Sequence, residues 1–149
     1  MGEVALLEKF IEGTEFTVPV LGNENPEALP ITELPIPPEH THLTLEDKFL
    51  PGGAEMITPA RFSKDITKKI QDTALQVFLS LGLKGYARID GFLTTEEEIL
   101  ITEPNTLPGA TPSTCLYHSA AEVNLSPMDL IEKIIDFAFK AHAKKRGPL

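Results

Sequence analysis

The chain has 149 residues, 42% of them hydrophobic, which is enough for one domain with a buried core. Its formal net charge of -9 disfavours a nucleic-acid partner, and no apolar run approaches the roughly 20 residues of a membrane-spanning helix. A single cysteine excludes an internal disulfide and the amino terminus has no secretory signal pattern, so we expect a cytoplasmic protein that does not bind membranes.

Two apolar stretches open the chain and predict a β-hairpin. Residues 4–11 and 15–21 are both rich in apolar side chains, and a turn at Glu12 and Gly13 separates them. A further short strand is expected within residues 28–34. Pro30 has no backbone donor and confines that strand to an edge or an irregular pairing.

Prolines and glycines dominate residues 35–53 and exclude a regular element there. Connections of this length in a compact domain are commonly functional, so we expect a mobile active-site loop. A short strand is expected at residues 54–58. Ser63 then begins a helix, with apolar side chains at helical spacing until Gly82.

The last third of the chain predicts two strands and a helix. The strands cover residues 86–93 and 99–105, and residues 108–113 form a loop. The helix begins at Ser126 as N-cap, and Asp129 completes a capping box. The sum is an α+β fold with a largely antiparallel sheet and two main helices.

The two late strands bring four polar side chains together. If Thr94 pairs with Ile99 across a four-residue loop, Asp90 faces Glu103 and Arg88 faces Asn105. Side chains alternate along a strand, so all four share one face of the hairpin. Two opposed carboxylates with a neighbouring amide oxygen suit a magnesium ion. The alternative is that Arg88 neutralises Asp90 and Glu103 is a rim residue, and the residues alone leave both open.

Two motifs carry a resemblance to the D-alanine:D-alanine ligase family, whose fold is the ATP-grasp. The closing motif of that family resembles residues 85–90, GYARID, together with 103–109, EPNTLPG. The strand pair that edges its adenine and ribose pocket resembles residues 8–18, EKFIEGTEFTV. The resemblance covers nearly the whole chain. It implies that residues 1–149 are the carboxy-terminal part of an ATP-grasp domain, without the amino-terminal domain and the small nucleotide subdomain.

The resemblance also implies roles for charged residues. Asp90, Glu103 and Asn105 would hold magnesium, as two ions that manganese could replace, against the phosphates of ATP. Arg88 would stabilise the acyl phosphate and the tetrahedral species, and Lys48 would close on the γ-phosphate. These residue types suit phosphoryl transfer, which depends on positioning and charge neutralisation.

The same resemblance implies a nucleotide site and a substrate site. Glu8, the backbone near Lys9, Phe10 and Ile11, and Glu15 would bind adenine and ribose, although the residues alone favour solvated glutamates at an edge. Gly109, Thr114 and Cys115 stand where the family binds the second amino acid.

Two of these positions depart from the family pattern. A serine is usual in place of Thr114 and an apolar residue in place of Cys115. Threonine keeps the hydroxyl. We interpret Cys115 as a packed residue rather than a nucleophile, because an acyl-phosphate mechanism needs no thiol.

The implied activity is ATP-dependent ligation of two D-alanines for peptidoglycan precursors, in a full enzyme that could be a homodimer. The chain alone is expected to be inactive, because it needs the amino-terminal lobe in cis or in trans. The alternatives are a non-catalytic nucleotide or metal binding module, a structural remnant, and a D-alanine:D-lactate ligase. The last is suggested by Phe49, where dipeptide-forming ligases usually have tyrosine.

Overall fold

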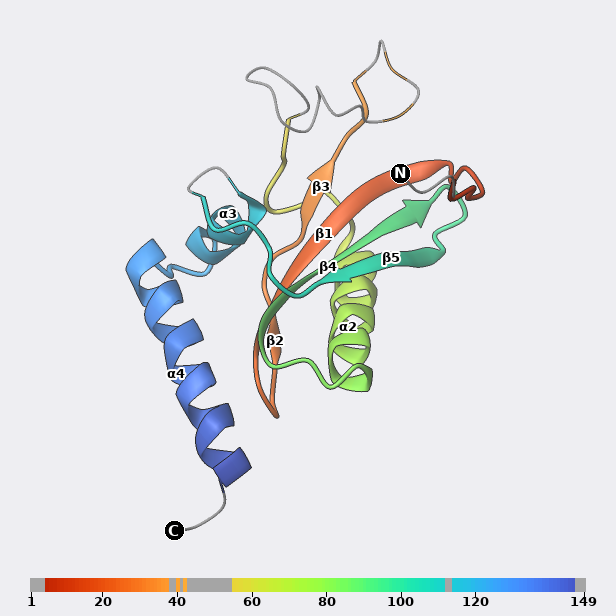
Figure 1. The fold of residues 1–149 in the computed structure, drawn as a ribbon. Helices are drawn as coiled ribbons and strands as arrows, with labels where there is room; N and C mark the ends of the chain where they lie inside the picture. The colour runs from red at the N-terminus through yellow and green to blue at the C-terminus, as the bar shows by residue number, and fades with distance from the viewer. Residues whose placement is uncertain (1–4, 38–39, 41, 43–54, 112–113, 147–149) are drawn as a thin grey trace.

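A computed structural model of the chain describes residues 5–37, 40, 42, 55–111 and 114–146 (Figure 1). Its sheet has the strand order β2-β1-β4-β5, with β3 also paired to β1, and every pairing is antiparallel. The strands are β1 (Gly13–Gly22), β2 (Glu27–Ala28), β3 (Thr32–Leu34), β4 (Gly85–Thr94) and β5 (Ile99–Asn105), and the helices are α2 (Lys64–Ser80), α3 (Cys115–Ala121) and α4 (Pro127–Arg146). The α+β class with an antiparallel sheet is confirmed.

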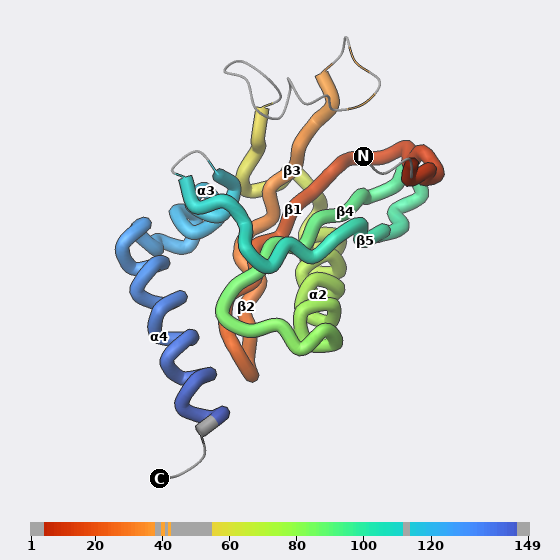
Figure 2. Tube along the Cα trace, viewed as in Figure 1, coloured from red at the N-terminus to blue at the C-terminus, as the bar shows by residue number. Residues whose placement is uncertain are grey.

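Helix α2 covers one face of the sheet (Figure 2). Ser63 caps it as expected, accepting a hydrogen bond from the Ile66 N–H. The main core lies between this helix and the sheet, and its members are all buried: Phe16, Val18, Val20, Ile31, Ile66, Ile70, Ala74, Phe78, Ala87 and Ile89. Apolar residues two apart on β1 and β4 meet apolar residues three or four apart on α2.

Helices α3 and α4 form a second, smaller core against the strands. Its buried members are Leu21, Leu29, Leu116, Ala120 and Leu130. The Asn23 side chain, in the β1–β2 turn, contacts α4. Its Nδ2 donates a hydrogen bond to the Phe137 carbonyl at 2.9 Å. The capping box at Ser126 and Asp129 is confirmed. No helix in the described part of the chain is long and apolar enough to span a bilayer.

The predicted amino-terminal hairpin is wrong. Residues 5–12 contain no strand, and β1 pairs along its whole length with β4, from Gly13 opposite Thr94 to Gly22 opposite Gly85. A Cβ on Gly13 would lie 2.3 Å from the Leu93 carbonyl oxygen, so this glycine permits a close strand approach rather than a turn. Pairing with a distant ten-residue strand outweighs the local turn pattern.

Other short strands also differ from expectation. Residues 28–34 are divided between β2 and β3 on either side of Pro30, as the missing donor of proline requires. Residues 55–58 form only one bridge, between Ile57 and Glu33. Helix α3 adds to the two main helices expected, and its bounds were not predicted because seven residues are too few to show clear helical periodicity.

The β4–β5 hairpin reaches the predicted pairs by an unexpected route. The Thr94 N–H donates to the Glu98 carbonyl and Glu97 has a φ of 60°, so the loop has three residues rather than four. The pairing then shifts between Asp90 and Gly91, which leaves Thr102 as a bulge. The two irregularities cancel, and Asp90 faces Glu103 while Arg88 faces Asn105.

Candidate active site

The strand register lays most of the predicted site residues of β1, β4 and β5 in rows on the sheet face opposite α2. Directly opposed residues share a face, so three rows follow one another: Glu15 with Phe92, then Thr17 with Asp90 and Glu103, then Pro19 with Arg88 and Asn105. Successive rows are two residues apart, or about 7 Å. The predicted nucleotide, metal and substrate residues on these strands therefore lie within a few side-chain lengths of one another.

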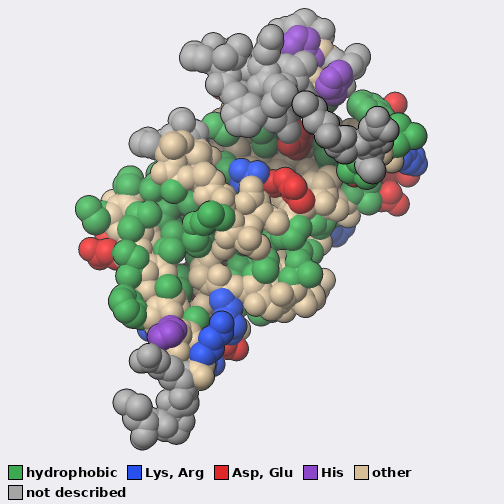
Figure 3. Space-filling view, viewed as in Figure 1, with side chains coloured by type: hydrophobic (Ala, Val, Ile, Leu, Met, Phe, Trp, Pro, Cys, Tyr) green, Lys and Arg blue, Asp and Glu red, His purple; other side chains and the backbone are tan. Residues whose placement is uncertain are grey.

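Asp90 is the centre of a compact polar cluster. Arg88 donates to it through Nη2 at 2.7 Å from Oδ2 and through Nε at 2.8 Å from Oδ1. Thr17 adds a third donor, with its Oγ1 2.6 Å from Oδ1. Asp90 is buried, and its hydrogen bonds raise the pKa of Arg88 above the ordinary arginine value. Figure 3 shows basic and acidic side chains side by side on this face.

The ion pair between Arg88 and Asp90 is thus formed in this structure, and Glu103 is exposed. Asn105 is half-buried, and its Oδ1 accepts a hydrogen bond from the Leu107 N–H at 3.2 Å. Among the described residues, no group of three or more Asp, Glu, His or Cys side chains is placed to hold a metal. An ion at Asp90 and Glu103 would also need the Asn105 amide and oxygens from phosphate or water, and this all-oxygen donor set fits magnesium.

All five residues predicted for adenine and ribose line a single pocket of about 530 Å³. Its walls are Glu8, Lys9, Phe10, Ile11, Ile36, His42, Glu15, Phe92 and Thr102. The volume lies within the range of small-ligand sites, and the walls combine apolar side chains with a few polar groups. Four of the lining residues were not predicted, namely Ile36, His42, Phe92 and Thr102. Thr102 is the bulged residue, and bulges redirect side chains beside binding sites.

The residues predicted for the second substrate lie at the start of α3. Gly109 is exposed, and a Cβ there would lie 3.5 Å from the Thr114 Cγ2. The Thr114 hydroxyl donates to the Thr111 carbonyl at 2.8 Å. Cys115 is buried, as expected of a packed residue, and burial raises its thiol pKa although the nearby Arg88 lowers it. The start of α3 therefore adjoins the Arg88 cluster.

Some predictions fall outside the described residues. Lys48 and Phe49 are among them, and of the expected loop at 35–53 only residues 35–37, 40 and 42 are described. Thr17, in contrast, was missed by sequence reasoning although it contacts Asp90. Its role depends on β1 lying beside β4, and the expected amino-terminal hairpin hid that pairing.

Comparisons with known proteins agree on one family. A family model described as D-ala D-ala ligase C-terminus matches residues 1–136. A D-alanine--D-alanine ligase from Desulforamulus reducens is 37% identical over 139 residues, which cover 91% of this chain and 42% of that protein. The chain thus spans about two fifths of the length of such a relative.

Solved structures share the fold. The D-alanine-D-alanine ligase from Coxiella burnetii superimposes with a TM-score of 0.78 at 27% identity, covering 93% of this chain and 35% of the other. The D-alanine--D-alanine ligase from Bacillus anthracis complexed with ATP has a TM-score of 0.71 at 22% identity, covering 95% and 42%. Both matches place the present fold inside a larger protein.

Proposed function

Because this chain belongs to the D-ala D-ala ligase C-terminus family, we propose that it is the nucleotide and metal half of an ATP-dependent ligase that joins two D-alanines. The reaction would activate one carboxylate as an acyl phosphate, which the amine of the second D-alanine attacks. Its dipeptide would serve peptidoglycan synthesis in the cytoplasm. The chain covers 42% of a matching relative, and the activity would also require the remaining part of such a ligase.

One observation carries this proposal. The pocket that contains all five predicted nucleotide residues lies on the sheet face that also holds the charged cluster. Asp90 and Glu103 are one row further along the strands, and Arg88 is two rows further. A nucleotide with its base in the pocket would have its phosphates near the acidic pair. Lys48 would approach the γ-phosphate from the loop at 35–53.

The groups near Asp90 suit the proposed chemistry. Bound magnesium would neutralise phosphate charge, and Asp90, Glu103 and Asn105 are the residues that would hold it. Arg88 would orient and stabilise the anionic reacting group, because a guanidinium binds phosphate and carboxylate through two parallel hydrogen bonds. Gly109 and Thr114 would bind the second D-alanine beside Arg88.

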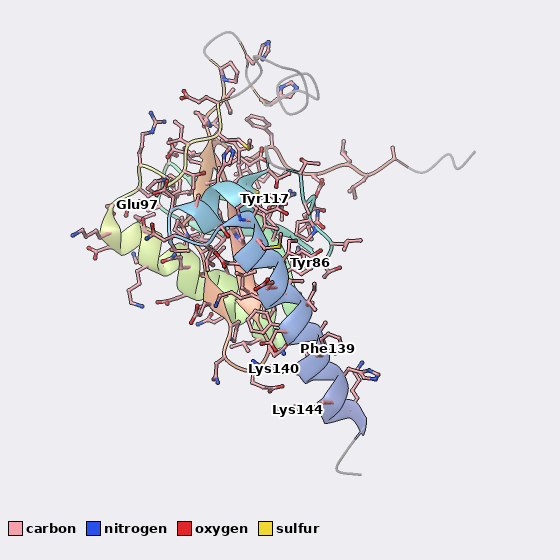
Figure 4. The ribbon with its side chains drawn as sticks, turned by 90° about the vertical axis from the view of Figure 1, so that its left-hand side faces the viewer. Tyr86, Glu97, Tyr117, Phe139, Lys140 and Lys144 are labelled. Carbon is pink, nitrogen blue, oxygen red and sulfur yellow. The ribbon has the colours of Figure 1, made fainter. Side chains whose placement is uncertain are left out.

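An exposed helix face supports the need for a partner lobe. Met128, Ile135 and Phe139 lie along one stripe of α4 and are 68%, 50% and 72% exposed, whereas Leu130 on the opposite face is buried. Figure 4 shows Phe139 with Lys140 and Lys144 along this helix. We propose that the lobe covers the stripe, in cis or in trans. The Phe139→Glu substitution should then weaken lobe association and leave the melting temperature of the chain unchanged.

The nucleotide site can be tested with the chain itself. We expect magnesium-ATP to shift the amide NMR signals of Ile11, Phe92 and Thr102 at millimolar concentration, with little thermal stabilisation because part of the phosphate site lies in the lobe. The Glu15→Gln variant should weaken these shifts, and Glu27→Gln, in a separate surface groove, is the matched control. Absence of any shift at ten millimolar nucleotide would contradict the nucleotide assignment.

The ligation itself can be tested in a hybrid protein, in which this chain is joined to the amino-terminal portion of a relative. We expect D-alanine-dependent phosphate release and the dipeptide product. Asp90→Asn should abolish both while the fold is retained. A hybrid that releases phosphate without forming a dipeptide would contradict the ligation, because water would then have taken the acyl group of the acyl phosphate in place of the second D-alanine.

A further inference from the structure

Thr17 is a buried donor to Asp90 that has no role in the function proposed so far. It lies on β1 directly opposite Asp90, and it is only 5% exposed. Its Oγ1 lies 2.6 Å from the Asp90 Oδ1, a short hydrogen bond from a hydroxyl to a carboxylate. The row continues to Glu103 on the far side of Asp90. Thr17 therefore holds the central carboxylate from the side opposite its acidic neighbour.

The proton arrangement around Thr17 is determined by its neighbours. A hydroxyl has one proton, and here Asp90 receives it. Thr17 therefore acts as a donor to the carboxylate, and this short hydrogen bond fixes the direction of its hydroxyl.

The two donors to Asp90 differ in how firmly they are held. Arg88 reaches Asp90 from a long side chain that is 27% exposed. Thr17 has a short β-branched side chain with few rotamers and is enclosed in the sheet. A divalent cation that approaches Asp90 competes with the positive guanidinium but not with the neutral hydroxyl. Arg88 is therefore the partner that a cation would displace, and Thr17 is the partner that stays.

We propose that Thr17 is a positioning residue, whose hydroxyl holds the Asp90 carboxylate in the orientation that receives a divalent cation. The inference rests on the metal site of the proposed function. Hydrogen-bond partners of metal-binding carboxylates commonly change metal affinity by about 10-fold to 100-fold when they are removed. Thr17 would contribute such an effect without touching the metal.

The test is the Mn²⁺ affinity of the full 149-residue chain, measured by electron paramagnetic resonance. We expect Thr17→Val, which keeps the shape and removes the hydroxyl, to weaken Mn²⁺ binding about 10-fold. Thr17→Ser, which keeps the hydroxyl, should bind within about twofold of the parent. Thr14→Val is the matched control, because Thr14 is on the same strand and alternation places it on the opposite face. Thr17→Ala replaces the valine variant if that variant does not fold.

The outcomes separate this inference from the metal site itself. Asp90→Asn should lose Mn²⁺ binding. If it does, and Thr17→Val binds Mn²⁺ as tightly as the parent, the Thr17 role is wrong and the metal site stands. If Asp90→Asn binds as the parent does, or neither protein binds Mn²⁺, the metal site is wrong and the Thr17 role fails with it. Equal loss in Thr17→Val and Thr17→Ser would also overturn the role of the hydroxyl.

Discussion

The two faces of β4 serve opposite purposes. Ala87 and Ile89 point toward α2 and are fully buried in an apolar core. Arg88 and Asp90, which alternate with them, point the other way into hydrogen bonds and an ion pair. One strand therefore stabilises the fold through one face and presents charged groups on the other. This arrangement holds the site on a rigid element without placing a charge in the core.

The comparison predicts that substitutions on the α2 face have the largest effect on stability. Phe78→Ala removes a fully buried ring between α2 and the sheet, and we expect a loss of about 3–5 kcal/mol in the free energy of unfolding. Urea denaturation measures it. The adjacent Leu79→Ala is the control, because Leu79 is 51% exposed and should lose little. Similar losses in both variants would show that α2 is not packed as described.

Gly91 lies on the α2 face of β4, at the point where the pairing with β5 shifts its register. A Cβ on Gly91 would lie 2.5 Å from the Leu100 carbonyl oxygen and 2.8 Å from the Phe16 Cζ. A backbone atom cannot move aside as a flexible side chain can, so Gly91→Ala should lower the free energy of unfolding by about 3 kcal/mol. Thermal melts measure this loss. Gly109→Ala is the control, because a Cβ on Gly109 would have its nearest neighbour at 3.5 Å. A stable Gly91→Ala protein would mean that the strands separate more readily than expected.

On the other face, Asp90→Asn should have a smaller effect on stability. From the sequence alone, repulsion between Asp90 and Glu103 predicted unchanged or higher stability. In the structure, Asp90 accepts hydrogen bonds from the positive Arg88 and from the neutral Thr17. Removal of its negative charge should therefore lower the free energy of unfolding by about 1.5 kcal/mol. Glu103→Gln, at an exposed position, should change stability little. Chemical denaturation of both variants without metal decides between repulsion and attraction.

The smallest effect is expected at the start of α4, which lies outside the main core. Ser126→Ala removes the N-cap and should cost about 1 kcal/mol. Hydrogen bonds from Ser126 lower the pKa of Asp129, so its contribution is present above the ordinary aspartate pKa and is lost as the pH falls below about 4. Melting temperatures at pH 3 and pH 7 should differ less in Asp129→Asn than in the parent. An unchanged difference would show that the capping box contributes nothing.

Local patterns were sufficient for some elements and not for others. Helix α2, the cap of α4 and strands β4 and β5 follow from periodicity, capping residues and turns within a few residues of each other. The pairing of β1 with β4 was not predicted, because it joins segments about 70 residues apart and no short-range signal marks it. Thr17 was missed for the same reason.

The candidate site shows a similar division. Alternation along the strands placed Arg88, Asp90, Glu103 and Asn105 on one face, and this placement is confirmed. The nucleotide residues came from resemblance, and their shared pocket depends on a segment, residues 8–11, that has no regular structure. No periodic pattern could have placed it. The metal, nucleotide and substrate roles remain predictions.

The bulge at Thr102 decides which side chains of β5 stand beside Asp90 as the family diverges. If Thr102 were paired regularly, it would stand opposite Asp90, and Glu103 and Asn105 would turn to the opposite face. Deletion of Thr102 would instead leave Gly91 opposite Ile101 and Asp90 opposite Glu103, because a bulged residue has no partner on the other strand. An extra residue at the tip would enlarge the loop and keep these pairs. Aligned sequences of the family should therefore show gaps at Thr102 and length changes at the tip that occur independently of each other.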